Sequence, residues 1–128
     1  MTMNMDIYAK ELLDHYKKPK NLGKIDNPDF VTQEYNPSCG DRIQIFGKIK
    51  NGKIEQISFL GEGCVISLAT ASMLTEFIKD KSTSEVLKLN SDDIIKLIKI
   101  KPGPTRLKCA LLPLYAIQSG VKKLEEKS

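Results

Sequence analysis

The chain has 128 residues, of which 41% are hydrophobic and 28% charged, and its formal net charge at pH 7 is +4. This length suits one domain, and the composition is typical of a folded globular protein, which excludes intrinsic disorder. No apolar run approaches the roughly 18 residues of a membrane-spanning helix. The N-terminus contains acidic residues and lacks the apolar core of a signal peptide. We therefore expect a cytoplasmic protein with no membrane partner.

The charges do not indicate a nucleic-acid surface. Lysines are spread along the whole chain and alternate with acidic residues, and only 6% of all residues are aromatic. A nucleic-acid-binding domain more often shows a dense basic stripe with aromatic side chains between the cations. We expect no nucleic-acid partner.

The N-terminal part of the chain predicts one helix and one short strand. In residues 6–18, Tyr8, Leu12 and Tyr16 recur at four-residue spacing, and a proline directly follows the run. Residues 30–36 are compatible with a first strand. The periodicity therefore changes from helical to extended before the first cysteine.

The next segment predicts a β-hairpin. Residues 41–50 alternate between polar side chains and an isoleucine face, which consists of Ile43, Ile45 and Ile49. The dipeptide Asn51–Gly52 is a typical two-residue hairpin turn. In the return strand, residues 53–61, the apolar side chains change face after Ile54, which predicts a bulge near Glu55–Gln56.

Helices are expected after the hairpin. Residues 64–80 are apolar or small almost all round, which is typical of a central helix packed on several sides. Two further helices are predicted over 83–89 and 91–99, the second with Ser91 as its N-cap. The order of one helix, a small three-stranded antiparallel sheet and then several helices packed on it predicts a single α+β domain.

Pro113 limits where the last helix begins. Proline is tolerated in the first turn of a helix but costs about 3 kcal/mol or more in the interior. The last helix is therefore expected to begin between Arg106 and Leu112 and to run to about Lys123.

Three cysteines, Cys39, Cys64 and Cys109, are candidates for a functional site. An odd number of distant thiols does not predict a disulfide framework, and composition alone favours buried core thiols. Their positions favour ligands instead: the first lies in a turn before a strand, and the other two are predicted at helix N-termini, which stabilise a thiolate. Gly40 and Gly63 beside them permit close backbone approach.

Asp41 is a candidate for a fourth ligand. Residues two apart in an extended segment point the same way, so Asp41 is expected to face the same site as Cys39. The alternative is that its carboxylate caps the local turn, and the residues alone leave both roles open. Three thiolates and one carboxylate suit Zn²⁺ or an iron–sulfur cluster. An oxygen ligand should hold iron less firmly than a fourth thiolate, which suits a cluster that must leave.

These motifs resemble a known family. The segments NPSCGD (36–41), GEGCVISLATASMLTE (61–76) and RLKCALLPLYAI (106–117) closely resemble the three cysteine motifs of the IscU/NifU/SufU family of iron–sulfur cluster assembly scaffolds. The segment LLDHYKKPKNLG (12–23) is similar to the N-terminal signature of that family. The resemblance covers nearly the whole chain and implies a single NifU N-terminal-like (IscU-type) scaffold domain over residues 1–128.

The resemblance implies a scaffold, without turnover of its own, on which Fe²⁺ meets sulfur delivered by a cysteine desulfurase. The resulting transient [2Fe–2S] cluster would then pass to acceptor apo-proteins. Matched position by position, Cys39, Asp41, Cys64 and Cys109 are the implied metal and cluster ligands. The resemblance to the SufU branch makes Cys109 the implied persulfide acceptor. Whether the chain is a monomer or a homo-oligomer stays open.

Two departures from the IscU branch support an alternative function. Lys108 stands where that branch commonly has a histidine, and the third motif is closer to the SufU branch, whose members resemble zinc-bound sulfur acceptors. The alternative is therefore a zinc-dependent, SufU-like sulfurtransferase with Zn²⁺ in the resting site. However, the insertion that the SufU branch usually carries between its second and third cysteines is missing here. We assign His15, in the N-terminal motif, a structural role.

Lys108 and Arg106 are the cations closest in sequence to the third cysteine. We expect them to offset the excess negative charge of three thiolates and a carboxylate, and Lys108 to pair with Asp41 when no metal is bound. The alternative is that both side chains face solvent beside the start of the helix.

Overall fold

The computed structural model describes residues 2–38 and 40–127, and the side chains of residues 9–38 and 40–126. Eight elements follow one another along this part of the chain. They are α1 (Thr2–Lys17), β1 (Phe30–Asn36), β2 (Asp41–Lys50), β3 (Lys53–Glu62), α2 (Val65–Ile78), α3 (Thr83–Lys88), α4 (Ser91–Ile98) and α5 (Pro104–Lys127). The predicted α+β order of a helix, a three-stranded antiparallel sheet and further helices is confirmed.

The sheet has the strand order β1-β2-β3, and both pairs are antiparallel. The predicted turn at residues 51–52 joins β2 to β3, and both of its residues have a positive φ, 54° and 73°. The register between the two strands shifts between Lys48 and Ile49, which leaves Glu55 as the extra residue on β3. The predicted bulge is therefore confirmed, and it explains why the apolar side chains of β3 change face.

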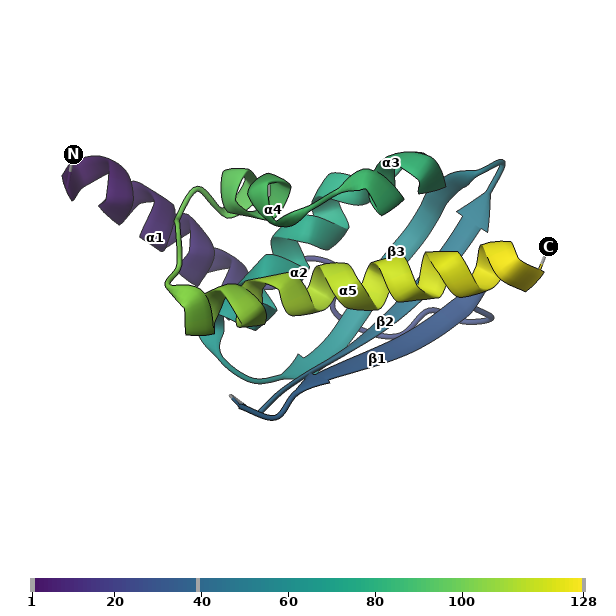
Figure 1. The fold of residues 1–128 in the computed structure, drawn as a ribbon, viewed down its shortest axis with the longest axis horizontal. Helices are drawn as coiled ribbons and strands as arrows, with labels where there is room; N and C mark the ends of the chain where they lie inside the picture. Colours follow the sequence, from purple (N-terminus) through teal and green to yellow (C-terminus); the bar gives the residue numbers. More distant parts are fainter. Residues whose placement is uncertain (1, 39, 128) are drawn as a thin grey trace.

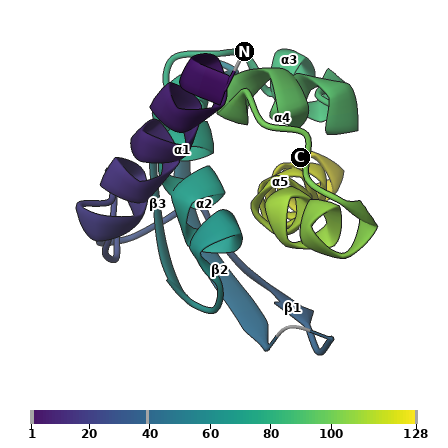
Figure 2. The ribbon, with the colours of Figure 1, turned by 90° about the vertical axis from the view of Figure 1, so that its left-hand side faces the viewer.

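The helices cover one face of the sheet, and α2 and α5 contact it directly (Figure 1). Viewed from the side, α2 lies between α1 and α5, as expected for a helix that is apolar nearly all round (Figure 2). The core between the sheet and the helices contains fully buried side chains from both, including Ile43, Ile45, Phe59, Leu74 and Leu114. The ends of the strands and helices that carry the motifs are therefore fixed relative to one another.

Phe30 sets the distance between α5 and the sheet. Its ring lies over Gly47 of β2 and against Gly120 of α5, where a Cβ atom at either glycine would overlap it. The Thr32 hydroxyl donates a hydrogen bond of 2.7 Å to the Ala116 carbonyl. These contacts place α5 along β1 and so determine where the first turns of α5 meet the end of the sheet.

The start of α4 differs from the prediction. Asn90, not Ser91, is the N-cap: its side chain accepts a hydrogen bond from the Asp93 amide at 3.2 Å, and Asp93 accepts one from the Asn90 amide at 2.9 Å. Asn90 has the extended backbone conformation of an N-cap, and its amide oxygen caps as well as a serine hydroxyl does. Ser91 is the first helical residue.

The last helix also begins earlier than predicted. α5 starts at Pro104, and Pro113 lies inside it. Pro104 suits the first helical position, where its missing N–H is not needed. The cost of the interior proline is offset by packing, because Leu112, Leu114 and Pro113 itself are buried. The prediction was wrong because the burial of the surrounding side chains outweighs the local cost of the proline.

His15 has a structural contact. Its Nδ1 atom lies 2.7 Å from the Ser72 hydroxyl of α2, and the same hydroxyl accepts a hydrogen bond of 2.7 Å from the Lys20 amide. This contact ties the end of α1 and the following turn to the central helix.

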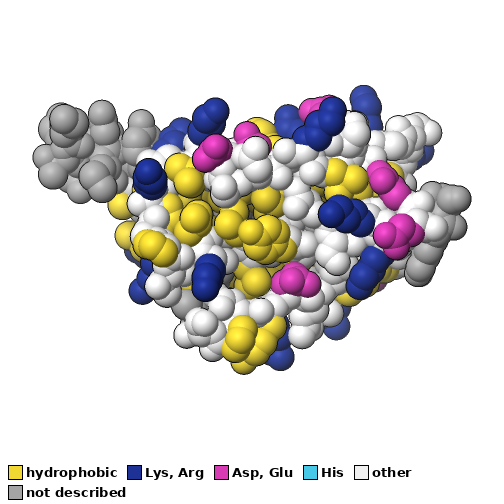
Figure 3. All heavy atoms as spheres, viewed as in Figure 1, with side chains coloured by type: hydrophobic (Ala, Val, Ile, Leu, Met, Phe, Trp, Pro, Cys, Tyr) yellow, Lys and Arg dark blue, Asp and Glu magenta, His cyan; other side chains and the backbone are white. Residues whose placement is uncertain are grey.

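The described surface carries charges of both signs. On the face shown in Figure 3, lysine and arginine side chains are scattered among acidic and hydrophobic ones. Among the described helices, none combines the length and hydrophobicity needed to cross a membrane.

Candidate metal centre

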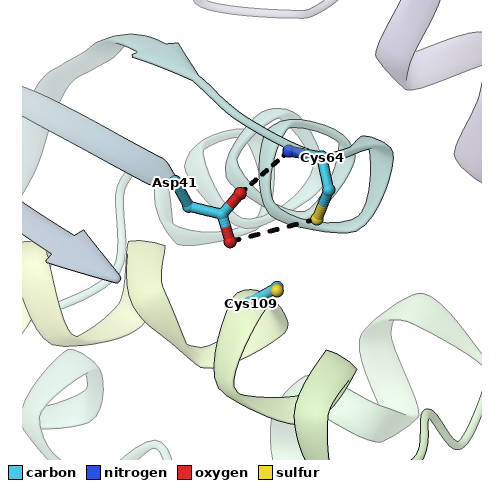
Figure 4. Close-up of side chains that lie close together, drawn as sticks. All are labelled: Asp41, Cys64 and Cys109. Atoms are coloured by element: carbon cyan, nitrogen blue, oxygen red, sulfur yellow. Dashed lines mark hydrogen bonds between the residues drawn. The ribbon is translucent and has the colours of Figure 1, made fainter. Parts of the chain in front are cut away.

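Asp41, Cys64 and Cys109 meet at one end of the sheet. Asp41 is the first residue of β2, Cys64 directly precedes α2, and Cys109 lies in α5. One carboxylate oxygen and the two sulfur atoms all lie within 4.8 Å of one another. Figure 4 shows the carboxylate pointing at Cys64 and the sulfur of Cys109 facing both from below. The tertiary fold therefore brings three of the four predicted ligands together. The fourth, Cys39, lies outside the described residues.

Asp41 has a contact that neither of its two predicted roles describes, and its role as a metal ligand stays a prediction. Its side chain is fully buried, and Oδ1 accepts a hydrogen bond of 2.8 Å from the Cys64 amide at the start of α2. Its other oxygen, Oδ2, lies 4.0 Å from the Cys64 sulfur. The carboxylate thus caps the N-terminus of α2 with one oxygen, which the Cys64 side chain does not do. The second oxygen faces the sulfur atoms.

Gly63 makes this close approach of Asp41 possible. Its φ is 144°, and a Cβ atom there would overlap the carboxylate of Asp41 and lie 2.9 Å from the Asp41 Cα. Only glycine combines this backbone conformation with the space that the carboxylate needs. Gly40 also has a positive φ, 71°, but no atom lies near the place of its missing side chain. Gly40 therefore serves the turn conformation, and Gly63 serves the contact.

Cys64 has the predicted position at a helix N-terminus. It is half-buried and is the N-cap residue of α2, so it lies at the end of the helix that carries the unpaired amides of the first turn. The Ser67 hydroxyl lies 3.9 Å from its sulfur and donates a hydrogen bond of 3.1 Å to its carbonyl. Ser67 is a neighbour of the site that the sequence did not predict.

Cys109 is not at a helix N-terminus, which corrects the prediction. It lies five residues after Pro104, the first residue of α5, and is therefore in the second turn, beyond the unpaired amides. Its side chain is fully buried. The thiol donates to the Thr105 carbonyl at 3.8 Å, and its sulfur accepts a hydrogen bond of 3.8 Å from the Asn36 side-chain amide.

Asn36 is the second neighbour that the sequence did not predict. It is the last residue of β1, it is buried, and it pairs with Asp41 in the strand register. Its membership of the segment that contains Cys39 was the available signal. Its contact with Cys109 spans 73 positions, so no local pattern identifies it.

Arg106 and Lys108 are exposed on the first turns of α5. Among the described residues Lys108 makes no ion pair with Asp41, so the predicted pairing is not observed, because the carboxylate is buried and points at the start of α2. Arg42, the neighbour of Asp41, forms an exposed ion pair with Glu62 across the hairpin.

The donor atoms fit a thiophilic metal ion. In a tetrahedral site, metal–sulfur distances of about 2.3 Å place two sulfur atoms roughly 3.8 Å apart, and a metal–oxygen distance of about 2.0 Å places a sulfur and an oxygen roughly 3.5 Å apart. The separation of 4.0 Å between Asp41 Oδ2 and Cys64 Sγ is slightly longer than the second of these values, and the spread of 4.8 Å for the whole group requires only small side-chain movements. Two sulfurs and one oxygen, with a further thiolate predicted at Cys39, match the preferences of Zn²⁺ and of iron in clusters.

Comparison with known proteins identifies the family. Residues 7–128 match the NifU-like N-terminal domain, so this chain belongs to that family. It is 39% identical to the zinc-dependent sulfurtransferase SufU of Bacillus subtilis (strain 168), over 95% of each chain. It is 35% identical to the iron–sulfur cluster assembly scaffold protein IscU 1 of Archaeoglobus fulgidus, over 90% of this chain and 74% of that protein.

A solved structure has the same fold. It belongs to a protein of Fervidobacterium islandicum AW-1 described as a candidate iron–sulfur cluster assembly scaffold for the SUF system. The two structures superpose with a TM-score of 0.77 and 29% sequence identity, over 87% of this chain and 93% of the other. The α+β architecture described above is thus that of the family.

Proposed function

We propose that this chain is an iron–sulfur cluster assembly scaffold, which binds iron, accepts sulfur from a cysteine desulfurase and transfers a [2Fe–2S] cluster to apo-proteins. The observation that carries the proposal is the convergence of Asp41, Cys64 and Cys109, from three separate elements, within 4.8 Å. The membership of this chain in the NifU-like N-terminal domain family and its similarity to an IscU scaffold support the same function. We expect it to act in the cytoplasm and to have no catalytic turnover of its own.

The proposed ligands of iron and of the cluster are Cys39, Asp41, Cys64 and Cys109. Thiolates bind iron tightly, whereas a carboxylate oxygen is a harder ligand that exchanges more readily. Asp41 is also held by the Cys64 amide through its other oxygen, so it can leave the metal without losing its position. Fe²⁺ and sulfide are the cargo of this site, and an exchangeable oxygen ligand favours release of the finished cluster to an acceptor.

We assign sulfur acceptance to Cys109. Its thiolate would attack the terminal sulfur of the desulfurase cysteine persulfide, a new S–S bond would form, and the desulfurase thiolate would leave. Two molecules of an external thiol would then reduce the persulfide, which releases the transferred sulfur as sulfide, regenerates the Cys109 thiol and joins the two external thiols in a disulfide. Because Cys109 is fully buried, this step requires the desulfurase to expose it by displacing the first turns of α5 or the segment before β2.

The alternative function is a zinc-dependent sulfurtransferase. The 39% identity to the Bacillus subtilis protein favours it, and the donor set also fits Zn²⁺ as the resting metal. That alignment spans 140 positions, more than the 128 residues of this chain, so the relative contains residues with no counterpart here. We prefer the scaffold because the chain lacks these residues.

Anaerobic reconstitution tests the proposal. The purified chain would be analysed for iron, acid-labile sulfide and zinc, then incubated with a cysteine desulfurase, cysteine, Fe²⁺ and a thiol reductant. A chromophore with equal iron and sulfide that moves to an apo-ferredoxin supports the scaffold. Loss of the chromophore in Cys64→Ser, with its retention in Lys101→Ser as an exposed control, would assign it to this site. One tightly bound zinc, no cluster, and desulfurase turnover that depends on Cys109 would establish the alternative.

A further inference from the structure

The two described cysteines of the metal centre have different surroundings. Cys64 lies at the N-terminus of α2, the end of the helix that carries unpaired amides and the positive end of the dipole. Cys109 lies in the second turn of α5, where the dipole effect has largely fallen off. A buried thiolate at Cys109 therefore needs a hydrogen-bond donor from another part of the fold.

Asn36 is such a donor. Its buried side-chain amide lies 3.8 Å from the Cys109 sulfur and is oriented to donate to it. A further hydrogen bond joins this sulfur to the Thr105 carbonyl at 3.8 Å, and there the thiol is the donor. A metal ion would bind the thiolate, which has no proton to donate. The bond to Thr105 would then be lost, whereas an N–H donated to sulfur would become stronger.

The β1–β2 register gives Asn36 a counterpart in Asp41. The two residues form the last pair between the strands, and both side chains face the helices. Asp41 accepts a hydrogen bond from the Cys64 amide, and Asn36 donates one to the Cys109 sulfur. The end of the hairpin thus holds the start of α2 with an acceptor and the α5 cysteine with a donor.

We propose that Asn36 is a positioning residue of the metal centre, which holds the Cys109 sulfur toward the metal by donating an N–H···S hydrogen bond to it. The inference rests on the proposed metal site. It goes further by naming a residue that binds no metal itself but determines the orientation and electron density of one thiolate. Such indirect partners of metal ligands typically change metal affinity by about 10- to 100-fold.

Cobalt substitution tests the inference, because Co²⁺ takes the same tetrahedral sites and its sulfur-to-metal charge-transfer band reports on the thiolates. Removal of an N–H···S bond raises the energy of the sulfur electrons and moves this band to longer wavelength. Asn36→Ala is expected to show this shift and to bind Co²⁺ about tenfold more weakly. Asn36→Leu fills the same volume without a hydrogen-bond donor and should show the same band shift and the same loss of affinity. If the alanine variant does not fold, the leucine variant provides the test. Gln33→Ala, an exposed amide on the same strand, is the matched control and should behave as wild type.

The outcomes separate the inference from the function on which it rests. If Asn36 had only a structural role, its substitution would lower the melting temperature but leave the charge-transfer band of the folded variant at its wild-type wavelength. An unchanged band and affinity in a folded variant, with a normal wild-type band, would overturn the role of Asn36 alone. A wild-type chain that gives no thiolate–cobalt band at all would overturn the metal centre and this inference together.

Discussion

Replacement of Gly63 by alanine should disturb the proposed metal centre through Asp41. The residue has a φ of 144°, and a Cβ atom there would overlap the Asp41 carboxylate. Backbone strain of this kind costs about 1–3 kcal/mol. Displacement of the carboxylate also removes the cap on the Cys64 amide, which is worth about 1 kcal/mol. We therefore expect Gly63→Ala to lower the free energy of unfolding by about 2–4 kcal/mol, or the melting temperature by roughly 8–16 °C for a domain of this size.

Two other glycines separate the strain from the clash. Gly52 has a φ of 73° with open space around it, so Gly52→Ala should cost only the backbone strain of about 1–2 kcal/mol. Gly103 has neither a positive φ nor a close neighbour, so Gly103→Ala should change stability by less than about 1 kcal/mol. The difference between Gly63→Ala and Gly52→Ala thus measures the contact with Asp41.

Thermal unfolding followed by circular dichroism, with and without Zn²⁺, measures both effects. Zn²⁺ at 100 times its Kd stabilises a folded chain by about 2.7 kcal/mol. This gain should persist in the Gly52 and Gly103 variants and shrink in Gly63→Ala, because the displaced carboxylate no longer faces the sulfurs. The reasoning is refuted if Gly63→Ala is no less stable than Gly52→Ala and keeps the full zinc-dependent gain.

The contacts of Asp41, Gly120 and His15 can each be tested by substitution. Asp41→Asn keeps an oxygen for the Cys64 amide but loses the charge, so isothermal titration should show weaker Zn²⁺ binding while the metal-free melting temperature changes little; an equal loss of both would contradict this. Gly120→Ala should destabilise the fold by about 1–3 kcal/mol in urea unfolding, because the added Cβ atom overlaps the Phe30 ring. Phe30→Leu in the same chain should restore part of this loss; if the two substitutions destabilise the fold additively, the contact does not exist. His15→Ala should cost about 1 kcal/mol in the same assay without changing bound metal, and altered metal content would reassign this histidine.

Local sequence patterns predicted the structure correctly where a few neighbouring residues control the backbone conformation. The turn at residues 51–52 follows from the preference of Asn–Gly for positive φ, and the bulge at Glu55 follows from the change of the apolar face. The position of Cys64 at the start of α2 follows from the glycines before it and the apolar run after it. Each of these features depends on hydrogen bonds and steric contacts within a short segment.

The same reasoning failed where packing outweighs local preference. Pro113 predicted a later start for α5, but the burial of its neighbours on the sheet stabilises the helix on both sides of the proline. As a result Cys109 lies in the second turn of the helix, and the expected support from a helix N-terminus is absent there. The hydrogen bond from Asn36 takes its place, which could not be predicted without knowing how α5 lies along β1.

Residue types and their immediate neighbours indicate which side chains are chemically suited to bind a metal and at which element ends most of them lie. Cysteine and aspartate types, turn glycines and helix starts are properties of single residues and their immediate neighbours. The tertiary structure alone decided that Asp41 and Cys64, which are 23 positions apart, share a hydrogen bond, and that Asn36 reaches Cys109 across 73 positions. These distances are set by the burial of α2 and α5 on one face of the sheet, and that burial depends on side chains from distant parts of the chain.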